Sequence, residues 1–148
     1  MRIVIQRVSH ANVKVEGETI GDIERGLLLL VGFQAEDSEA LVDKMLAKIV
    51  RMRIFEDQQG KMNVSVEDMK GSLLIVSQFT LYANPWSGRR PDFIRAARPD
   101  DAIPLYHYMV EKAKTFGLPV ATGEFGADMK VNLCNDGPVT IWLDSDDI

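Results

Sequence analysis

The chain has 148 residues, a length that fits one domain with a single hydrophobic core. Its composition, 46% hydrophobic and 26% charged, is ordinary for a globular protein, and no apolar segment approaches the roughly 20 residues of a membrane-spanning helix. The formal net charge of −5 argues against a broad basic surface for duplex nucleic acid but permits a local basic patch.

Cysteine and histidine are too sparse for a cluster of metal ligands. Cys134 is the only cysteine, which excludes an internal disulfide. His10 and His107 do not have the spacing of metal ligands. We therefore expect neither a metal nor a cofactor. The apolar stretch at the N-terminus is too short for a signal peptide, so a cytoplasmic protein is expected.

Strand patterns dominate the N-terminal part of the chain. Residues 2–9 are rich in β-branched side chains, and residues 12–16 alternate between polar and apolar, as a half-exposed strand does. Gly17 marks a hairpin turn into a further strand over residues 19–23. Residues 27–31 are an unbroken aliphatic run, which is typical of a strand buried on both faces.

An amphipathic helix and a second hairpin follow. Ser38 suits the N-cap of the helix. The apolar side chains after it recur at helical spacing, at Leu41, Val42, Met45, Leu46 and Ile49. Residues 53–55 and 62–66 flank the turn sequence of residues 57–60, so they are expected to pair as a hairpin.

The next strand ends in an unusual way. Residues 73–76 form a second aliphatic run, and the polar side chains of Ser77, Gln78 and Thr80 follow it. A polar side chain left unpaired at the end of a buried strand costs about 1–3 kcal/mol. These groups therefore either find partners inside the protein or serve a ligand, and this segment alone leaves both interpretations open.

A loop over residues 84–98 carries four arginines, Arg89, Arg90, Arg95 and Arg98. Guanidinium groups in a rigid loop with aromatic neighbours suit phosphate or a single-stranded nucleic-acid end. A second amphipathic helix follows, for which Asp100 or Asp101 is the expected cap and Pro104 is expected in the first turn. Gly117 ends the helix.

The C-terminal part contains short strand patterns around one turn. Residues 120–122 and 130–134 are expected to be short strands, residues 135–138 a turn, and residues 139–143 the final strand. Cys134 is expected to be a small buried hydrophobe, and the acidic C-terminal tail a solvated end.

Strands outnumber helices and come mainly as hairpins, so the predicted fold class is α+β. We expect a mostly antiparallel, barrel-like β core with two amphipathic helices packed on it, in one domain over residues 1–148.

No standard catalytic set is present. No Ser/His/Asp arrangement can be defended, and no glycine-rich phosphate loop occurs. One more feature bears on function, the Gly137-Pro138 pair before the last strand. If the bond between them were cis, which is true of about 5–6% of X-Pro bonds in folded proteins, the two carbonyls would form an acceptor pair for an ammonium group.

Together these features resemble the D-aminoacyl-tRNA deacylase family over essentially the whole chain. The segments that carry the resemblance are Gln6-Arg7-Val8, residues 77–81, Arg90-Pro91, residues 127–129 and residues 135–140. The two long segments, in this order and spacing, are the specific ones.

The resemblance implies a cytosolic homodimer that hydrolyses the ester between a D-amino acid and the terminal ribose of tRNA, and that also acts on glycyl-tRNA. It implies that Gly137 and Pro138 form a cis pair inserted into the partner subunit's pocket. There the carbonyls would engage the substrate α-amino group and leave no room for an L side chain. Arg7 would steady this turn, and Met129, Asn135 and Arg90 would support it or bind substrate.

The catalytic residues implied by the resemblance are Ser77, Gln78, Phe79 and Thr80. Side chains of the first two and backbone amides of the last two can donate to a developing oxyanion. Thr80 could be a nucleophile, but no base is evident to activate it. The resemblance implies that the tRNA 2′-hydroxyl takes part in the reaction, which fits a sequence that offers positioning groups rather than a general base.

Three rival interpretations stay open. The first is a non-catalytic module that binds an RNA 3′ end through the arginine loop and Phe93. The second is a conventional serine or threonine esterase acting on small substrates. The third is a dimerisation unit in which Ser77 and Gln78 are purely structural.

Overall fold

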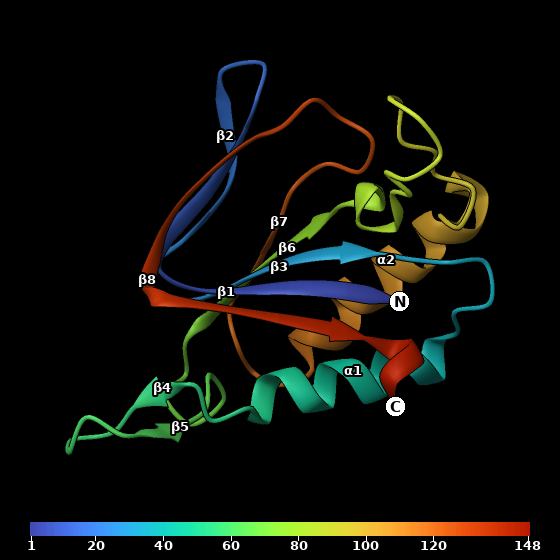
Figure 1. Cartoon of the computed structure of the whole chain (residues 1–148). Coiled ribbons are helices and arrows are strands. Elements are labelled where there is room, and N and C mark those ends of the chain that lie inside the picture. The colour runs from blue at the N-terminus through green and yellow to red at the C-terminus, as the bar shows by residue number, and fades with distance from the viewer.

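The structure, a computed structural model, describes residues 1–148 and is built around one mixed sheet (Figure 1). The strand order is β2 (Glu18–Ile23), β1 (Arg2–Val15), β3 (Gly26–Gly32), β6 (Ser72–Ser77) and β7 (Val120–Thr122). The long strand β8 (Lys130–Asp144) pairs with β1 off this path. Two helices, α1 (Glu39–Arg51) and α2 (Pro99–Lys114), pack on the sheet, so the predicted α+β class is confirmed.

The sheet combines antiparallel and parallel pairs. β1 is antiparallel to β2, β3 and β8, whereas β3–β6 and β6–β7 are parallel. Each parallel pair is joined through a helix, α1 between β3 and β6 and α2 between β6 and β7, because a parallel return needs a crossover connection. The predicted hairpin between the first helix and β6 also forms, from β4 (Phe55–Glu56) and β5 (Met62–Val64).

The two aliphatic strands β3 and β6 are buried on both faces, as their sequences predict. Leu29 and Ile75 belong to the large core beneath the helices. Leu28, Leu74 and Val76 point the other way, into a smaller core that the outer halves of β1 and β8 enclose. The sheet thus curls into a nearly closed, barrel-like form around the second core (Figure 1).

The N-cap predicted for α1 is confirmed, whereas the one predicted for α2 is not. Ser38 caps α1 by accepting a hydrogen bond from the Leu41 amide at 3.2 Å, as predicted. The cap expected at Asp100 or Asp101 is wrong, because α2 begins at Pro99 after Arg98. Pro99 provides the φ angle of a first helical residue, and both aspartates lie in the first turn, where the helix dipole favours negative charge. Pro104 lies further inside the helix than predicted.

The strands at both ends of the chain are longer than predicted. Residues 2–9 and 12–16 belong to the single strand β1, and the expected turn at residues 135–138 lies within β8. Gln6 pairs with Thr140 and Val8 with Asn135, so residues 136–139 bulge out opposite Arg7 alone. We call residues 136–139 the β8 bulge.

One expectation about the C-terminal region is wrong, and a second holds only in part. Cys134 is exposed rather than buried, because it lies at the bend of β8, where its pairing partner His10 is exposed as well. The acidic tail is solvated only at its end, where Asp146 and Asp147 are exposed, and two contacts anchor it. The Met1 amino group donates to Ser145 Oγ at 2.7 Å, and Arg95 pairs with Asp146 at 3.0 Å. No helix combines the length and the apolar character that crossing a membrane requires.

Shortening a side chain of β3, which is buried on both faces, tests this packing. Leu29 is 0% exposed, so Leu29→Ala should lower the free energy of unfolding by about 2–5 kcal/mol in urea denaturation. Met62, which is 49% exposed on the hairpin, is the control. Met62→Ala should change the free energy of unfolding by less than about 0.5 kcal/mol. Equal effects of the two substitutions would contradict the assignment of Leu29 to the core.

Candidate active site

The end of β6 forms the floor of the candidate site. The strand stops at Ser77, and the chain turns into a short 3-10 helix, η1 (Phe79–Tyr82). The Gln78 amide donates to the Val31 carbonyl at 2.7 Å, and the first hydrogen bond of the turn runs from the Leu81 amide to the Gln78 carbonyl at 3.2 Å. The amides of Phe79 and Thr80 precede that bond, so they are available to an external acceptor.

The polar side chains of this segment are only partly satisfied within the chain. Gln78 Nε2 donates to Thr80 Oγ1, whereas the half-buried Ser77 hydroxyl forms no hydrogen bond within the protein. Phe79 is 55% exposed and packs edge-on against Phe93, with 5.1 Å between the ring centroids. The strand end therefore presents one free hydroxyl, one amide–hydroxyl pair and one aromatic face.

Two cavities meet at this strand end. The first, which we call the strand-end cavity, has a volume of about 270 Å³ and lies between Ser77, Gln78 and Phe79 and the segment from Phe125 to Met129. The second, which we call the aromatic cavity, has a volume of about 310 Å³ and is lined mainly by apolar groups, Phe93 and Ala102 among them. Ser77, Phe79 and Phe125 line both cavities and thus form the wall they share.

Ionisable groups are scarce around the strand end. Asp128 is the only one that lines the strand-end cavity, and Arg98 is the only one that lines the aromatic cavity. Neither histidine lines either cavity, so Ser77 has no imidazole base beside it there, and Thr80 itself lines neither cavity. No group of three or more His, Cys, Asp or Glu residues is arranged to hold a metal ion.

Tyr106 supports β6 from the side of α2. Its hydroxyl donates to the Ile75 carbonyl at 2.8 Å, and burial raises the pKa of Tyr106 to about 12. The phenol therefore stays protonated at neutral pH and remains a donor to β6. Its ring lies 5.8 Å from that of Phe125, so one side chain contacts both the strand and the opposite wall of the cavities.

The β8 bulge is held by hydrogen bonds from the side chains of Arg7 and Asn135. Arg7 is only 6% exposed, unlike an ordinary surface arginine of a strand. Its Nε donates to the Asp136 carbonyl at 2.9 Å, and its Nη1 donates to the Ile54 carbonyl at 2.8 Å. Asn135 fastens the other side, because its Nδ2 donates to Gln6 Oε1 at 2.8 Å and its Oδ1 accepts from the Val139 amide at 3.3 Å.

The tip of the bulge faces outward. Gly137 and Pro138 are exposed, and the peptide bond between them is cis. Gly137 has a φ of +129°, and a Cβ built there would lie 2.9 Å from Arg7 Nη2 and from Val139 Cγ2. A residue with a side chain is therefore both strained and crowded at this position.

The structure brings some predicted site residues together and separates others. Ser77, Gln78, Phe79 and Met129 line the strand-end cavity. The bulge does not line it. Ile3 pairs with Val31, next to Gln78, whereas Arg7 lies four residues further along β1, roughly 14 Å away at about 3.4 Å per residue. In Figure 1 the bend of β8 lies at the left, well apart from the end of β6. Arg90 is exposed in its loop and lines neither cavity.

Sequence reasoning missed Phe125 as a site residue. It lies two residues before the 127–129 segment, and nothing in its local sequence marks it. Only the path of the connection between β7 and β8, which returns over the end of β6, places it between the two cavities.

Comparisons with known proteins agree with one another. The family model described as D-Tyr-tRNA(Tyr) deacylase matches residues 4–144. A D-aminoacyl-tRNA deacylase of Geotalea uraniireducens is 57% identical over 145 residues, which cover 98% of this chain and 94% of that protein.

Two solved structures share the fold. One, titled c-Myc DNA Unwinding Element Binding Protein, has a TM-score of 0.91 at 41% identity and covers 98% of this chain and 99% of its own. The other, titled a probable eukaryotic D-amino acid tRNA deacylase, has a TM-score of 0.85 at 17% identity and covers 96% of this chain and 97% of its own. At that identity the second match supports the fold alone.

Removing the buried guanidinium tests how the bulge is held. Arg7→Ala leaves the carbonyls of Asp136 and Ile54 without their donors, which should lower the free energy of unfolding by about 1–3 kcal/mol. Amide hydrogen exchange at residues 136–139 should become faster. The exposed Arg53 is the control, and Arg53→Ala should leave both measurements nearly unchanged. Unchanged exchange in Arg7→Ala would show that Asn135 holds the bulge alone.

Proposed function

Because the chain belongs to the D-Tyr-tRNA(Tyr) deacylase family, whose members are hydrolases acting on the ester bond of D-aminoacyl-tRNA, we propose that residues 1–148 form one catalytic domain with its active site at the end of β6. The observation that carries this proposal is the unpartnered Ser77 hydroxyl beside two free amides at the wall of a cavity. The function is tested by a time course of hydrolysis that compares D- and L-tyrosyl-tRNA.

The strand end suits the stabilisation of an oxyanion. Hydrolysis of an ester places negative charge on the carbonyl oxygen, and preorganised donors lower the barrier most when they need not reorient. The amides of Phe79 and Thr80 are fixed by the turn, and Ser77 precedes them with only Gln78 between. We assign these three groups to the developing oxyanion, with Gln78 positioning the adjoining part of the substrate.

The substrate itself supplies the missing proton-transfer group. Thr80 Oγ1 accepts a hydrogen bond from Gln78, and no hydrogen bond joins it to a histidine that could remove its proton. The 2′-hydroxyl of the terminal ribose is adjacent to the ester when the amino acid is carried on the 3′-oxygen. We assign it the role of orienting or activating the attacking water, while the protein provides position and charge stabilisation.

The two cavities match the two parts of an aminoacylated 3′ end. The strand-end cavity, with its polar wall and Met129, accommodates the aminoacyl group. The aromatic cavity, flanked by the Phe79 and Phe93 rings, accommodates the terminal adenine through stacking. The ester then lies at the shared wall, next to Ser77 and Phe79.

Selection against L-amino acids requires a second subunit in this proposal. The β8 bulge is too far from the strand-end cavity of its own chain to reach it, yet it is exposed and firmly held by Arg7 and Asn135. In a homodimer the carbonyls of Gly137 and Pro138 enter the partner's cavity and accept hydrogen bonds from the substrate α-ammonium. An L side chain then collides with the bulge, whereas glycine, which has no side chain, is tolerated.

A non-catalytic module that binds RNA 3′ ends is the second candidate, because the exposed arginine loop suits it. The two candidates differ in one measurement. Binding of D-tyrosyl-tRNA without release of D-tyrosine would support the binding module and contradict the hydrolase.

Substitutions at the strand end test which catalytic roles belong to the protein and which belong to the tRNA 2′-hydroxyl. Thr80→Ala loses one neutral hydrogen bond, so hydrolysis of D-tyrosyl-tRNA should stay within about tenfold of the wild-type rate. Ser77→Ala, the matched variant, removes a proposed oxyanion donor and should slow hydrolysis by about 100-fold or more. A tRNA ending in 2′-deoxyadenosine should be hydrolysed about 100-fold or more slowly by the wild type. Complete inactivity of Thr80→Ala with intact folding and tRNA binding would reject substrate assistance.

Crowding the bulge tests the source of chiral discrimination. Gly137→Ala places a Cβ against Arg7 and Val139 and displaces the bulge. The ratio of D- to L-tyrosyl-tRNA hydrolysis should therefore fall, by about 10- to 200-fold. Gly60 is the control, because it also has a positive φ, of +76°, and open space around it. Gly60→Ala also places a side chain at a positive φ, but far from the site, and should leave the ratio unchanged.

Mixed dimers then decide whether the site crosses between subunits. A heterodimer of a Ser77→Ala subunit and a Gly137→Ala subunit contains one fully intact site if the bulge acts in its partner's cavity. It contains no intact site if each bulge acts in its own chain. Wild-type discrimination in half of the sites is the expected result, and its absence would overturn the cross-subunit arrangement.

A further inference from the structure

One loop beside the candidate site exposes large apolar side chains that the core does not use. In the arginine loop, residues 84–98, Trp86 is 91% exposed and Ile94 is 87% exposed. An indole with almost its whole surface in water contributes little to folding. The mechanism above assigns no role to either residue.

The loop is held firmly at its base. Asn84 and Asp92 exchange two backbone hydrogen bonds, at 2.8 and 3.1 Å, and Asn84 Nδ2 donates to Asp92 Oδ2 at 3.1 Å. The Trp86 amide donates to Asn84 Oδ1 at 3.2 Å. Hydrogen bonds from Ser87, from the Ile94 amide and from Asn84 keep the pKa of Asp92 below its usual range, so Asp92 is ionised at neutral pH and ties the loop together. The exposed indole is thus carried on an ordered base.

Consecutive residues of the loop face two different cavities. Phe93 lines the aromatic cavity and contacts Phe79. Asp92 and Ile94, on either side of it, line a third cavity of about 420 Å³, which Trp86 and Arg95 also line. The linings of the two cavities are therefore joined through residues 92–94 of the loop.

The loop is basic on an acidic chain. It contains four arginines and one aspartate, a formal charge of +3, whereas the whole chain carries −5. Arg95 pairs with Asp146, but Arg89, Arg90 and Arg98 form no ion pair within the chain. These three guanidinium groups are free to contact an anion from outside, and phosphate is the anion that a bidentate guanidinium fits best.

We propose that Trp86 stacks on the base of an unpaired nucleotide that precedes the terminal adenosine of the substrate, while Arg89 and Arg90 contact the neighbouring phosphates. The inference rests on the proposed function, because it takes the adjoining aromatic cavity as the site of the terminal adenine. Aromatic faces next to free cations are the usual means of holding a single strand without reading its sequence. The loop then supplies affinity for the nucleic acid, and the strand-end cavity supplies the chemistry.

Two substrates separate this role from catalysis. D-Tyrosyl-tRNA contains the nucleotides before the terminal adenosine, whereas the ester D-tyrosyl-adenosine lacks them. Trp86→Ala should lower kcat/KM for D-tyrosyl-tRNA by about 5- to 100-fold, mainly through KM. It should leave kcat/KM for D-tyrosyl-adenosine unchanged. Trp86→Phe keeps an aromatic face and should retain most of the activity on both substrates.

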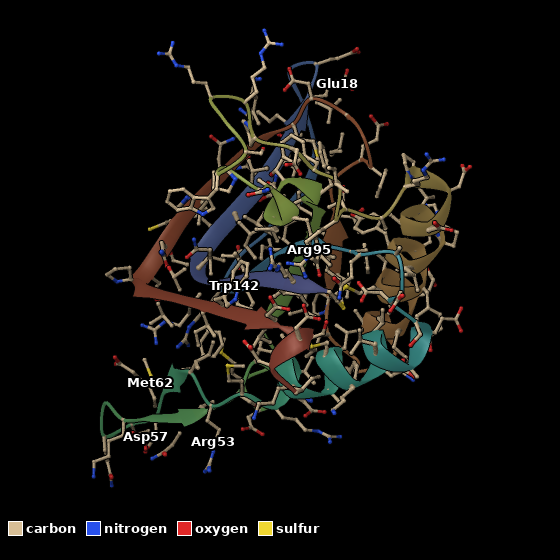
Figure 2. All side chains as sticks on the ribbon, turned by 45° about the vertical axis from the view of Figure 1, so that its right-hand side comes forward. Glu18, Arg53, Asp57, Met62, Arg95 and Trp142 are labelled. Carbon is tan, nitrogen blue, oxygen red and sulfur yellow. The ribbon has the colours of Figure 1, made fainter.

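The arginines are tested by the salt dependence of binding. A short single-stranded RNA ending in CCA, with a fluorescent label, serves as the probe in anisotropy titrations at several salt concentrations. Each of Arg89→Ala and Arg90→Ala should reduce the slope of log K against log salt by about 0.7. Trp86→Ala should weaken binding without changing the slope. Met62→Ala is the control, because Met62 is an exposed apolar residue on the hairpin far from Arg95 (Figure 2).

The outcomes distinguish this inference from the proposed function. If Trp86→Ala lowered kcat/KM equally for D-tyrosyl-tRNA and D-tyrosyl-adenosine, or for neither of them, the proposed role of Trp86 would be overturned. If the wild type hydrolyses neither ester, the proposed function fails, and the anisotropy comparison of the wild type with Trp86→Ala still decides whether the loop binds the strand. A change in sedimentation of Trp86→Ala would show that the surface contacts a second copy of this chain, which would also reject the inference.

Discussion

The whole molecule depends on burying both faces of two adjacent aliphatic strands, β3 and β6. Because neither face of these strands reaches water, polar chemistry can lie only where a strand ends. β6 ends at Ser77, and the parallel crossovers through α1 and α2 bring the surrounding loops to the same region. The candidate site is thus placed by the sheet, while its shape comes from the connections that return over it.

The strand β8 pairs with β1 along most of its length but bends sharply in the middle, and the pairing is interrupted there. Four residues opposite Arg7 cannot stay in register, so they bulge outward. The buried guanidinium of Arg7 donates to the Asp136 carbonyl, which the ladder no longer serves, and to the Ile54 carbonyl before β4. This arrangement makes an exposed feature rigid. An exposed, rigid backbone turn is suited to act on a neighbouring molecule rather than on its own chain, which is the reason that the proposed site is shared between subunits.

Local patterns predicted a large part of the fold and the centre of the site. The aliphatic runs, the Ser38 cap, the hairpin turns and the abrupt change to Ser77 and Gln78 each depend on neighbours in the sequence, and each appears where expected. Signals of the same local kind failed at residues 135–138 and at Cys134. Turn-forming residues also suit a bulge, and the exposure of one cysteine depends on whether another element covers it.

The sequence alone therefore determined the element types, the two strands with no exposed face, and the polar residues that end one of them, because periodicity and composition act over a few residues. Tertiary structure alone decided that the sheet is mixed, that Phe125 lines both cavities, that Arg7 is buried beside the bulge, and that Gly137 and Pro138 line neither cavity of their own chain. Those features arise from contacts between segments distant along the chain, and the path of the connections fixes such contacts only once the sheet has formed.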